Sequence, residues 1–259
     1  MTARDAVGAA VDALTAAGVD TPRLDAEVLI ADALGVDRAA LILDESLPIP
    51  GAAARLIGER IRRRVAREPV AYILGVKGFR RLVLRVDSRV LIPRPESELL
   101  VEVCLWLPAG ARVHDVGTGS GAVALALRDE RPDLVVTASD ASPFALQVAA
   151  TNGLEAVLAR GLPAGEYDMV VANLPYVRED EWDGLAPEIR LWEPREALVS
   201  GPDGLDAIRS LVAQAPPGTR LALEHSPAQT EAVKGLLDSP RVYPDLAGLP
   251  RVTVGFSRE

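Results

Sequence analysis

Three glycines at alternate positions form the first stretch of the chain that could hold a ligand. A short apolar run, 112–116, precedes them, and a helical run begins at Ala122. Because glycine has no Cβ, such a loop can turn sharply and bring its backbone against a ligand. The helix behind it would direct unpaired N–H groups and the positive end of its dipole at an anionic group such as a carboxylate. The candidate ligand-binding residues are Gly117, Thr118, Gly119, Ser120 and Gly121.

The glycine spacing and two acidic residues indicate which ligand this loop holds. The dinucleotide fingerprint is G-x-G-x-x-G, whereas this loop is G-x-G-x-G and follows Asp115. An acidic residue there opposes a pyrophosphate but suits an ammonium group. Asp140 ends the next apolar run, where a carboxylate can accept both hydroxyls of a ribose. Carboxylate, ammonium and ribose together describe S-adenosylmethionine better than NAD; a glycine-rich turn in another α/β protein is the alternative.

A turn after a later apolar run could hold a planar amino group. The Asn173 side-chain oxygen can accept one N–H, the Leu174 carbonyl can accept the other, and Tyr176 can stack on the flat group. Pro175 fixes the turn. Holding both N–H groups aims the nitrogen lone pair at a methyl sulfonium, so that positioning is the main catalytic device. We therefore expect Asn173, Pro175 and Tyr176 to be catalytic; an ordinary strand-end turn is the alternative.

The composition limits the classes of partner. The chain has 259 residues, of which 49% are hydrophobic and 25% charged, and its net charge is −9. These values are typical of a globular protein and argue against bulk binding to a nucleic-acid backbone. A basic cluster, 60–67, has helical spacing and is expected to be a solvated face. The lone Cys104 lies in an apolar run and is expected to be buried.

The sequence carries no visible signal for secretion or membrane insertion. The chain opens without a basic segment followed by an apolar one, and no apolar run approaches the roughly eighteen residues of a membrane span. We therefore expect a soluble, cytoplasmic protein. The only histidines, His114 and His225, lie in expected strands, and no cluster has the spacing of metal ligands, so no metal site is expected.

Changes in periodicity divide the chain into two expected domains joined by a linker. Residues 1–70 show helical periods only and predict a small bundle suited to docking a substrate. Residues 71–92 alternate with a period of two and predict a β-hairpin linker. Residues 93–259 form the second domain, in which a helix begins at Pro95 and is expected to run to about Leu107.

From Ala111 onward, expected strands and helices alternate. This alternation builds a mostly parallel sheet with helices on both faces. Ligands of such sheets bind beyond the carboxyl ends of the strands, where Gly117, Asp140 and Asn173 fall. The last two strands are separated by only a few residues and must be antiparallel to each other. The expected strands are 112–116, 134–139, 155–159, 167–173, 219–225, 241–246 and 251–256.

Several motifs together resemble the HemK/PrmC family of glutamine methyltransferases over nearly the whole chain. The stretch 90–98, Val-Leu-Ile-Pro-Arg-Pro-Glu-Ser-Glu, is similar to the family's interdomain signature, and 115–121 is similar to its donor loop. The resemblance implies an α/β fold in which a small N-terminal helical bundle precedes a seven-stranded, Rossmann-like class I methyltransferase sheet. Other stretches that match in order are 68–75, 193–195, 203–204 and 223–225.

The resemblance also implies an activity and a partner. The enzymes of this family transfer a methyl group from S-adenosyl-L-methionine, which becomes S-adenosyl-L-homocysteine, to the glutamine side-chain amide in the Gly-Gly-Gln motif of peptide chain release factors. By resemblance, the glycine loop, Asp140 and Asn173 hold the donor. The residues that hold the substrate glutamine would be Asn173, Leu174, Pro175 and Tyr176.

Two departures from the family pattern leave alternatives open. Leu174 stands where the family usually has proline, and Asn-Leu-Pro-Tyr is also similar to the motif of ribosomal-RNA adenine methyltransferases. The segment from Asn152 to Tyr167 is shorter, and 159–161 replaces the usual acid and aromatic beside the adenine. The alternatives are a methyltransferase of a ribosomal-protein glutamine or an RNA base amine, and a drifted paralogue that binds donor or partner with little catalysis.

Overall fold

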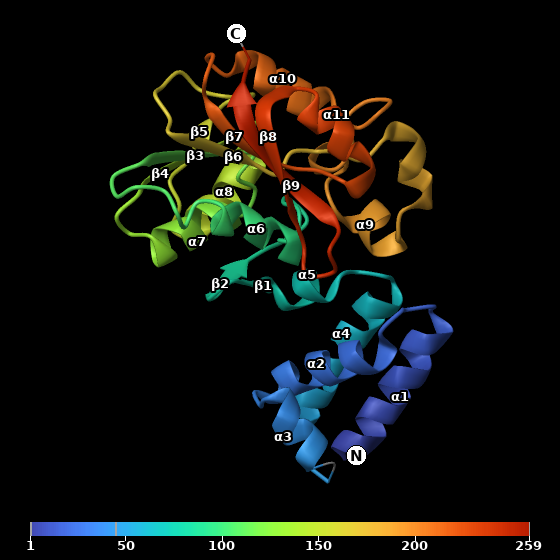
Figure 1. Cartoon of the computed structure of the whole chain (residues 1–259). Helices are drawn as coiled ribbons and strands as arrows, with labels where there is room; N and C mark the ends of the chain where they lie inside the picture. Colours follow the sequence, from blue (N-terminus) through green and yellow to red (C-terminus); the bar gives the residue numbers. More distant parts are fainter. Residues whose placement is uncertain (1, 45, 259) are drawn as a thin grey trace. The chain divides into compact units, whose positions relative to one another are not determined.

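The computed structural model describes residues 2–44 and 46–258, and its contacts divide the chain into two compact units (Figure 1). The helical unit runs to Gly75 and includes the later segment Ala186–Trp192. The sheet unit comprises Val76–Leu185 and the chain from Glu193 onward. In the described part of the chain, no helix is both long and apolar enough to cross a bilayer.

Short helices pack around an aliphatic core in the helical unit. α1 begins with a capping box in which Thr2 and Asp5 accept each other's backbone N–H. α2 begins at Pro22, a residue favoured in the first turn of a helix, and is capped by Gly35 in the left-handed conformation. The helices are α1 (Ala3–Ala16), α2 (Pro22–Leu34), α3 (Arg38–Leu43), α4 (Gly51–Val65), α5 (Val70–Leu74) and α9 (Pro187–Trp192).

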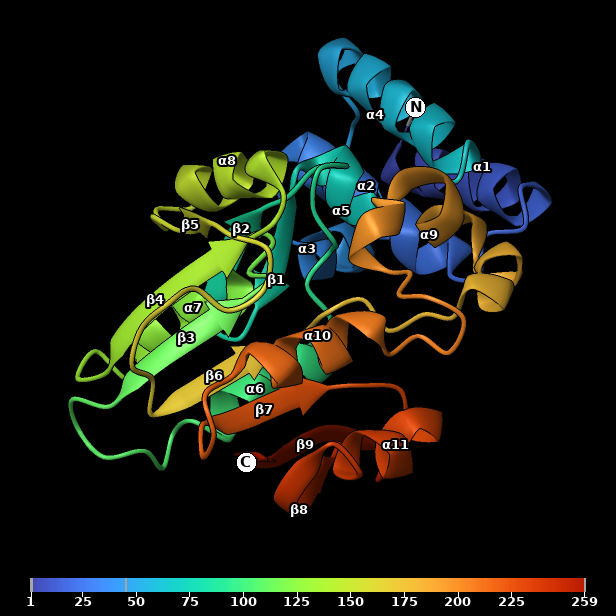
Figure 2. The same cartoon turned by 90° about the horizontal axis from the view of Figure 1, so that it is seen from above.

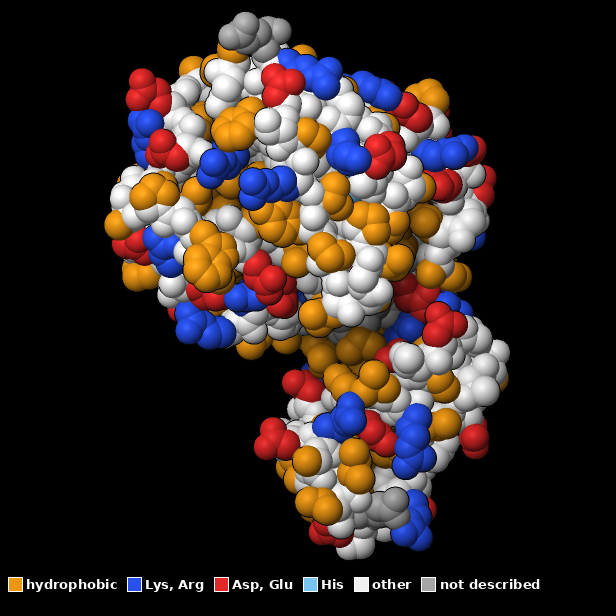
Figure 3. All heavy atoms as spheres, viewed as in Figure 1, with side chains coloured by type: hydrophobic (Ala, Val, Ile, Leu, Met, Phe, Trp, Pro, Cys, Tyr) orange, Lys and Arg blue, Asp and Glu red, His pale blue; other side chains and the backbone are white. Residues whose placement is uncertain are grey.

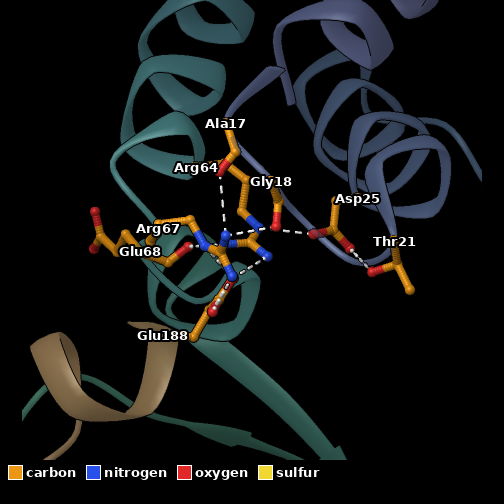
Figure 4. A network of polar contacts seen from close by, with 8 residues as sticks. All are labelled: Ala17, Gly18, Thr21, Asp25, Arg64, Arg67, Glu68 and Glu188. Atoms are coloured by element: carbon orange, nitrogen blue, oxygen red, sulfur yellow. Dashed lines mark hydrogen bonds and ion pairs between the residues drawn. The ribbon is translucent and has the colours of Figure 1, made fainter. Parts of the chain in front are cut away.

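The basic cluster in and after α4 forms ion pairs inside the helical unit (Figure 4). The Arg64 guanidinium is buried, 2.7 Å from Asp25 Oδ2 and 2.8 Å from Glu188 Oε1. Arg67 donates two hydrogen bonds of 2.7 Å to the Glu188 carboxylate. Arg62 is exposed, but the expectation of a solvated face is wrong for Arg64. Its partners lie on α2 and α9, so helical spacing alone could not reveal them.

The sheet unit is built on seven strands in the order β5-β4-β3-β6-β7-β9-β8 (Figure 2). Neighbouring strands from β5 to β7 are parallel, whereas β9 pairs antiparallel with both β7 and β8. These pairings confirm the predicted sheet and its antiparallel final pair. The strands are β3 (Arg112–Val116), β4 (Val135–Asp140), β5 (Val157–Leu158), β6 (Met169–Ala172), β7 (Arg220–Glu224), β8 (Leu237–Pro244) and β9 (Pro250–Ser257).

Helices cover both faces of the sheet. Successive residues of a strand point to opposite faces, so a strand that is apolar throughout presents side chains to the helices on each side. On β6, Met169 and Val171 join the core formed with α6 and α7, while Val170 and Ala172 join the core formed with α10 and α11. All four side chains are buried, as expected for a central parallel strand. Cys104 is buried in the first core, as predicted. The helices of this unit are α6 (Glu98–Glu102), α7 (Ala122–Glu130), α8 (Pro143–Thr151), α10 (Asp206–Gln214) and α11 (Thr230–Lys234).

The predicted β-hairpin forms within the sheet unit. β1 (Val76–Phe79) and β2 (Leu82–Arg85) pair antiparallel, and Arg80 in their turn has a φ of 50°. The Arg80 guanidinium donates hydrogen bonds of 2.7 and 2.8 Å to the Glu130 carboxylate on α7. This bidentate pair, together with buried apolar residues of both strands, ties the hairpin to α7 and the core around it.

The helix that the sequence predicts from Pro95 is shorter than expected. A 3-10 turn, η1 (Pro95–Ser97), precedes α6, which ends at Glu102 instead of near Leu107 because the chain tightens into three-residue turns before Pro108. The structure also shows no helix in the described segment between β5 and β6, residues 159–168. There the chain is held by backbone and side-chain bonds, including one of 3.2 Å from the Leu162 N–H to Gln214 Oε1.

Candidate active site

Four parallel strands end side by side at one edge of the sheet. Val116 is in register with Ser139 and with Ala172, and Ala172 is in register with Leu223. The residues that follow these positions therefore meet at the carboxyl edge, where ligands of open α/β sheets bind. They are Gly117 after β3, Asp140 at the end of β4, Asn173 after β6 and Glu224 at the end of β7.

The loop after β3 depends on its glycines. The φ angles of Gly117, Gly119 and Gly121 are 73°, 57° and 86°, a region that strains residues with a side chain. A Cβ on Gly121 would also lie 2.9 Å from Leu154 Cδ2. α7 begins immediately afterwards, at Ala122, so the unpaired N–H groups of its first turn lie next to the loop. The predicted loop is therefore compact, so that a ligand can contact its backbone directly.

Asp115 is buried at the base of this loop and holds it together. Its Oδ2 accepts a hydrogen bond of 2.6 Å from the Thr118 hydroxyl. Burial raises the pKa of Asp115 to about 6, although hydrogen bonds from Thr118 and from the Ala124 N–H lower it. The structure therefore shows Asp115 bracing the loop, and its expected attraction for an ammonium group stays a prediction.

Asp140 connects the loop to the start of α8. Its Oδ2 accepts the Gly119 N–H at 2.8 Å, and its Oδ1 accepts the Ser142 N–H at 2.8 Å. Each carboxylate oxygen keeps a second lone pair, so both can still accept a ribose hydroxyl. Burial raises the pKa of Asp140, while these backbone hydrogen bonds lower it. The carboxylate is thus fixed in orientation before any ligand arrives.

Asn173 is oriented by a serine from the stretch that resembles the interdomain signature. Asn173 Nδ2 donates a hydrogen bond of 2.8 Å to Ser97 Oγ, and Ser97 is buried. Because the nitrogen end of this amide is occupied, Asn173 Oδ1 is the end that remains for a ligand N–H. The 3-10 turn η1 places this hydroxyl at the carboxyl edge of the sheet.

The turn that begins with Asn173 packs directly against the glycine loop. Leu174 Cδ2 lies 3.0 Å, and the Asn173 carbonyl oxygen 3.9 Å, from the position that a Cβ on Gly117 would occupy. The Tyr176 carbonyl accepts a hydrogen bond of 2.9 Å from Gln229 Nε2, which anchors the far end of the turn. The structure therefore brings together the two candidate sites that the sequence places on separate strands.

A small pocket of about 30 Å³ opens beside this turn, enough for about one water-sized group. Arg94 lines it and forms a short ion pair with Glu193, whose other carboxylate oxygen accepts the Ile92 N–H at 3.0 Å. Pro175 is half-buried and does not line the pocket. The lining residues are Leu91, Arg94, Asn173, Leu174, Tyr176, Val177, Ala197 and Leu198.

Glu224 is a buried acid beside the same turn. It is 1% exposed; its Oε1 lies 3.5 Å from the Tyr176 hydroxyl, and its Oε2 has no hydrogen-bond partner among the described residues. Burial raises the pKa of Glu224 to about 7, while the Ser97 hydroxyl and the charge of Arg251 lower it. Burial, together with the charge of Glu224, also raises the pKa of Tyr176, which keeps the phenol neutral.

Sequence reasoning did not identify Ser97, Glu193 or Glu224 as site residues. All three lie in stretches whose likeness to the HemK/PrmC family is visible, but their side chains meet the turn only in the folded chain. One local signal was present for Glu224. Like Asp140, it is a carboxylate that ends an apolar strand in a chain where such ends gather at one edge.

The strand order, the glycine loop and the acidic end of β4 define a class I methyltransferase. Comparison with family models agrees with this class. The model described as PrmC N-terminal domain matches residues 5–75, and the model described as Methyltransferase small domain matches residues 95–201.

Relatives along the whole chain narrow the class to one family. The release factor glutamine methyltransferase of Cereibacter sphaeroides is 42% identical over 268 residues, covering 98% of this chain and 94% of that protein. The protein of the same name from Moorella thermoacetica is 41% identical over 288 residues and covers 100% of both. That from Xylella fastidiosa strain 9a5c is 40% identical over 264 residues, covering 93% and 96%. The chain belongs to the release factor glutamine methyltransferase family, which confirms the resemblance read from its motifs.

Proposed function

We propose that this protein transfers a methyl group from S-adenosyl-L-methionine to the side-chain amide nitrogen of the glutamine in the Gly-Gly-Gln motif of peptide chain release factors. The observation that carries the proposal is the contact between the glycine loop and the Asn173 turn, 3.0 Å from Leu174 Cδ2 to the Cβ position of Gly117. It places a donor-type loop against an amide-type turn. Family membership supports the same reaction and substrate.

The donor site assigned here consists of the glycine loop with Thr118 and Ser120, the Asp140 carboxylate and Asn173. The positive-φ glycines let the loop backbone approach the donor, and the N–H groups of α7 favour its carboxylate. Asp140, already held by two backbone N–H groups, accepts the ribose hydroxyls. When bound, the donor supplies an electrophilic methyl carbon on a sulfonium and leaves as S-adenosyl-L-homocysteine.

The acceptor site assigned here is the turn itself. Asn173 Oδ1 accepts one N–H of the substrate amide, the Leu174 carbonyl accepts the other, and Tyr176 stacks on the amide plane. Pro175 holds Leu174 in an extended conformation. An amide nitrogen is a weak nucleophile because its lone pair is conjugated. Holding the nitrogen in place, with its lone pair directed at the methyl carbon, therefore provides most of the rate enhancement. Asn173, Pro175 and Tyr176 are therefore the catalytic residues of the proposal.

The division into two domains and a linker assigns a task to each part of the chain. Residues 1–70 dock the release factor, 71–92 link the domains, and 93–259 carry the chemistry. We expect no bulk binding to nucleic acid and a cytoplasmic location, where release factors act. The net charge of −9 supports the expected lack of nucleic-acid binding, and on the face in Figure 3 arginines and lysines lie among acidic residues instead of gathering in one patch.

Methyl transfer from labelled donor to purified release factor tests the proposal. Wild-type protein should label the release factor and leave a variant without the Gly-Gly-Gln glutamine unlabelled. Asn173→Ala should lower kcat about a hundredfold or more while the circular dichroism spectrum persists. Label on an RNA or a ribosomal protein alone would assign the enzyme to another substrate. Donor binding without transfer to any of them would indicate a drifted paralogue.

A further inference from the structure

We propose that Ser97 and Glu224 form a positioning relay that fixes the side-chain amide of Asn173 with its oxygen toward the substrate. The inference rests on the proposed function, because Asn173 is the residue assigned there to hold the glutamine amide. Ser97 comes from η1 and Glu224 from the end of β7, so both lie outside the turn that they support.

The relay is needed because an asparagine amide has two nearly isosteric ends. One end accepts hydrogen bonds and the other donates them, and a substrate N–H requires the accepting end. Asn173 Nδ2 lies 2.8 Å from Ser97 Oγ. The Ser97 hydroxyl carries a single proton. If that proton pointed at Asn173, the amide would turn over and present its NH₂ group to the substrate NH₂.

Glu224 supplies the acceptor that directs the Ser97 proton away from Asn173. An ionised carboxylate can only accept, and Glu224 Oε2 has no partner among the described residues. Its Oε1 meets the Tyr176 hydroxyl only at 3.5 Å. The carboxylate therefore has lone pairs free for Ser97, whose own lone pairs then face Asn173 Nδ2. The Ser97 hydroxyl lowers the pKa of Glu224 against the effect of burial, which agrees with this polarity.

The charged groups around Glu224 leave its ionisation adjustable near neutral pH. Burial raises its pKa to about 7; Glu96 adds to this effect, whereas Arg251 opposes it. The Arg251 guanidinium also interacts with two other acids: it donates a hydrogen bond of 2.9 Å to Asp245 and lies 3.8 Å from the Glu96 carboxylate. His225, the next residue, is bonded to Thr253 and to the Ser226 carbonyl. When Glu224 is protonated, its hydroxyl can donate a hydrogen bond to Ser97, and the orientation of the Asn173 amide is no longer fixed.

The orientation of Asn173 can be measured without any methyl transfer. The chain has only two asparagines, Asn152 and Asn173, so selective ¹⁵N-asparagine labelling gives two side-chain NH₂ signals. Asn152 donates to the Arg85 and Ser120 carbonyls and serves as an internal reference. In Ser97→Ala, exchange of the Asn173 NH₂ protons with water should become about tenfold faster or more, because their acceptor is gone. Ser97→Thr should restore slow exchange, and unchanged exchange in Ser97→Ala would overturn the relay.

Kinetics separate positioning from a structural role. Ser97→Ala and Glu224→Gln should each lower kcat by about tenfold or more, with the KM for release factor and the Kd for donor changed by less than about twofold. Ser97→Thr should keep most of the activity. Wild-type kcat should rise between about pH 6 and 8 as Glu224 ionises, and Glu224→Gln should lack that rise. Ser257→Ala, which removes another buried hydroxyl of the sheet unit, should leave kcat unchanged.

The outcomes separate failure of the relay from failure of the proposed function. Absence of wild-type transfer to the release factor contradicts the proposed function. Wild-type transfer, with Ser97→Ala within about twofold of it in kcat, contradicts the relay alone. A loss confined to KM or to donor Kd also overturns it. Should Glu224→Gln fail to fold, the Ser97→Ala and Ser97→Thr pair decides, because it changes one hydroxyl position only.

Discussion

Leu174 Cδ2 lies 3.0 Å from the point that a Cβ on Gly117 would occupy. Gly117 belongs to the loop after β3 and Leu174 to the turn after β6, and these strands are neighbours in the sheet. The donor loop and the acceptor turn therefore share a packing surface. Adding one methyl group to the loop should displace the turn, because closely packed interiors have little space for an added group.

Gly117→Ala should weaken donor binding through this contact. Gly117 has a φ of 73° and Gly110 a φ of 78°, but a Cβ on Gly110 meets nothing within 4 Å. Both alanine variants should lose about 1 kcal/mol of stability from the left-handed backbone. Only Gly117→Ala should also lower donor affinity, by about tenfold or more, in calorimetric titrations. Equal donor affinities in the two variants would contradict the shared packing surface.

Asp140→Ala should weaken donor binding by about 1–3 kcal/mol, the usual cost of losing a charged hydrogen-bond acceptor. Calorimetry with the donor and with an analogue lacking the ribose hydroxyls gives a double-mutant cycle. The wild type should lose affinity for the analogue, whereas Asp140→Ala should bind both alike. An equal loss in both proteins would show that Asp140 acts only through the Gly119 and Ser142 N–H groups.

Asp115→Asn should change how stability depends on pH. Burial raises the pKa of Asp115 from 3.8 to about 6 in the folded state, so the folded state binds a proton more tightly than the unfolded chain. The stabilisation is therefore complete below about pH 4 and is lost as the pH rises through about 6. Between these limits the wild type should lose about 2–3 kcal/mol relative to Asp115→Asn in urea unfolding. A pH-independent difference between the two proteins would show that Asp115 is not protonated in this range.

Glu188→Gln should loosen the helical unit alone. Glu188 pairs with both Arg64 and Arg67, and Arg64 is buried, so losing the charge should cost about 1–3 kcal/mol. Hydrogen exchange followed by mass spectrometry should show faster exchange in α4 and α9, with the sheet unit unchanged. Glu231→Gln, which breaks an exposed pair with Lys234, is the control and should leave exchange unchanged. Unaltered protection of α9 would contradict the role of Glu188.

The sequence was most informative where the chemistry is local. Gly117 to Gly121, Asp140 and Asn173 each sit in a strand-end motif whose residue types and spacing limit the ligand, and parallel strands bring such ends to one edge. The antiparallel final pair also followed from a short connection. These features needed no knowledge of distant contacts.

The rest depended on contacts between segments far apart in the chain. Ser97 reaches Asn173 across 76 positions, and Arg64 reaches Glu188 across 124. Neither periodicity nor spacing encodes such pairs. The early end of α6 at Glu102 had a different origin, since apolar periodicity continues to Leu107 while the backbone changes to tighter turns.

The most direct test of the central claim is to locate the methyl group on the product. Release factor incubated with the protein and S-adenosylmethionine should be digested and sequenced by tandem mass spectrometry. We predict the mass increase of one methyl group on the glutamine of the Gly-Gly-Gln motif and its absence when Asn173→Ala replaces the wild type. A methyl group on any other residue, or none on a release factor under conditions of confirmed donor binding, would contradict the account.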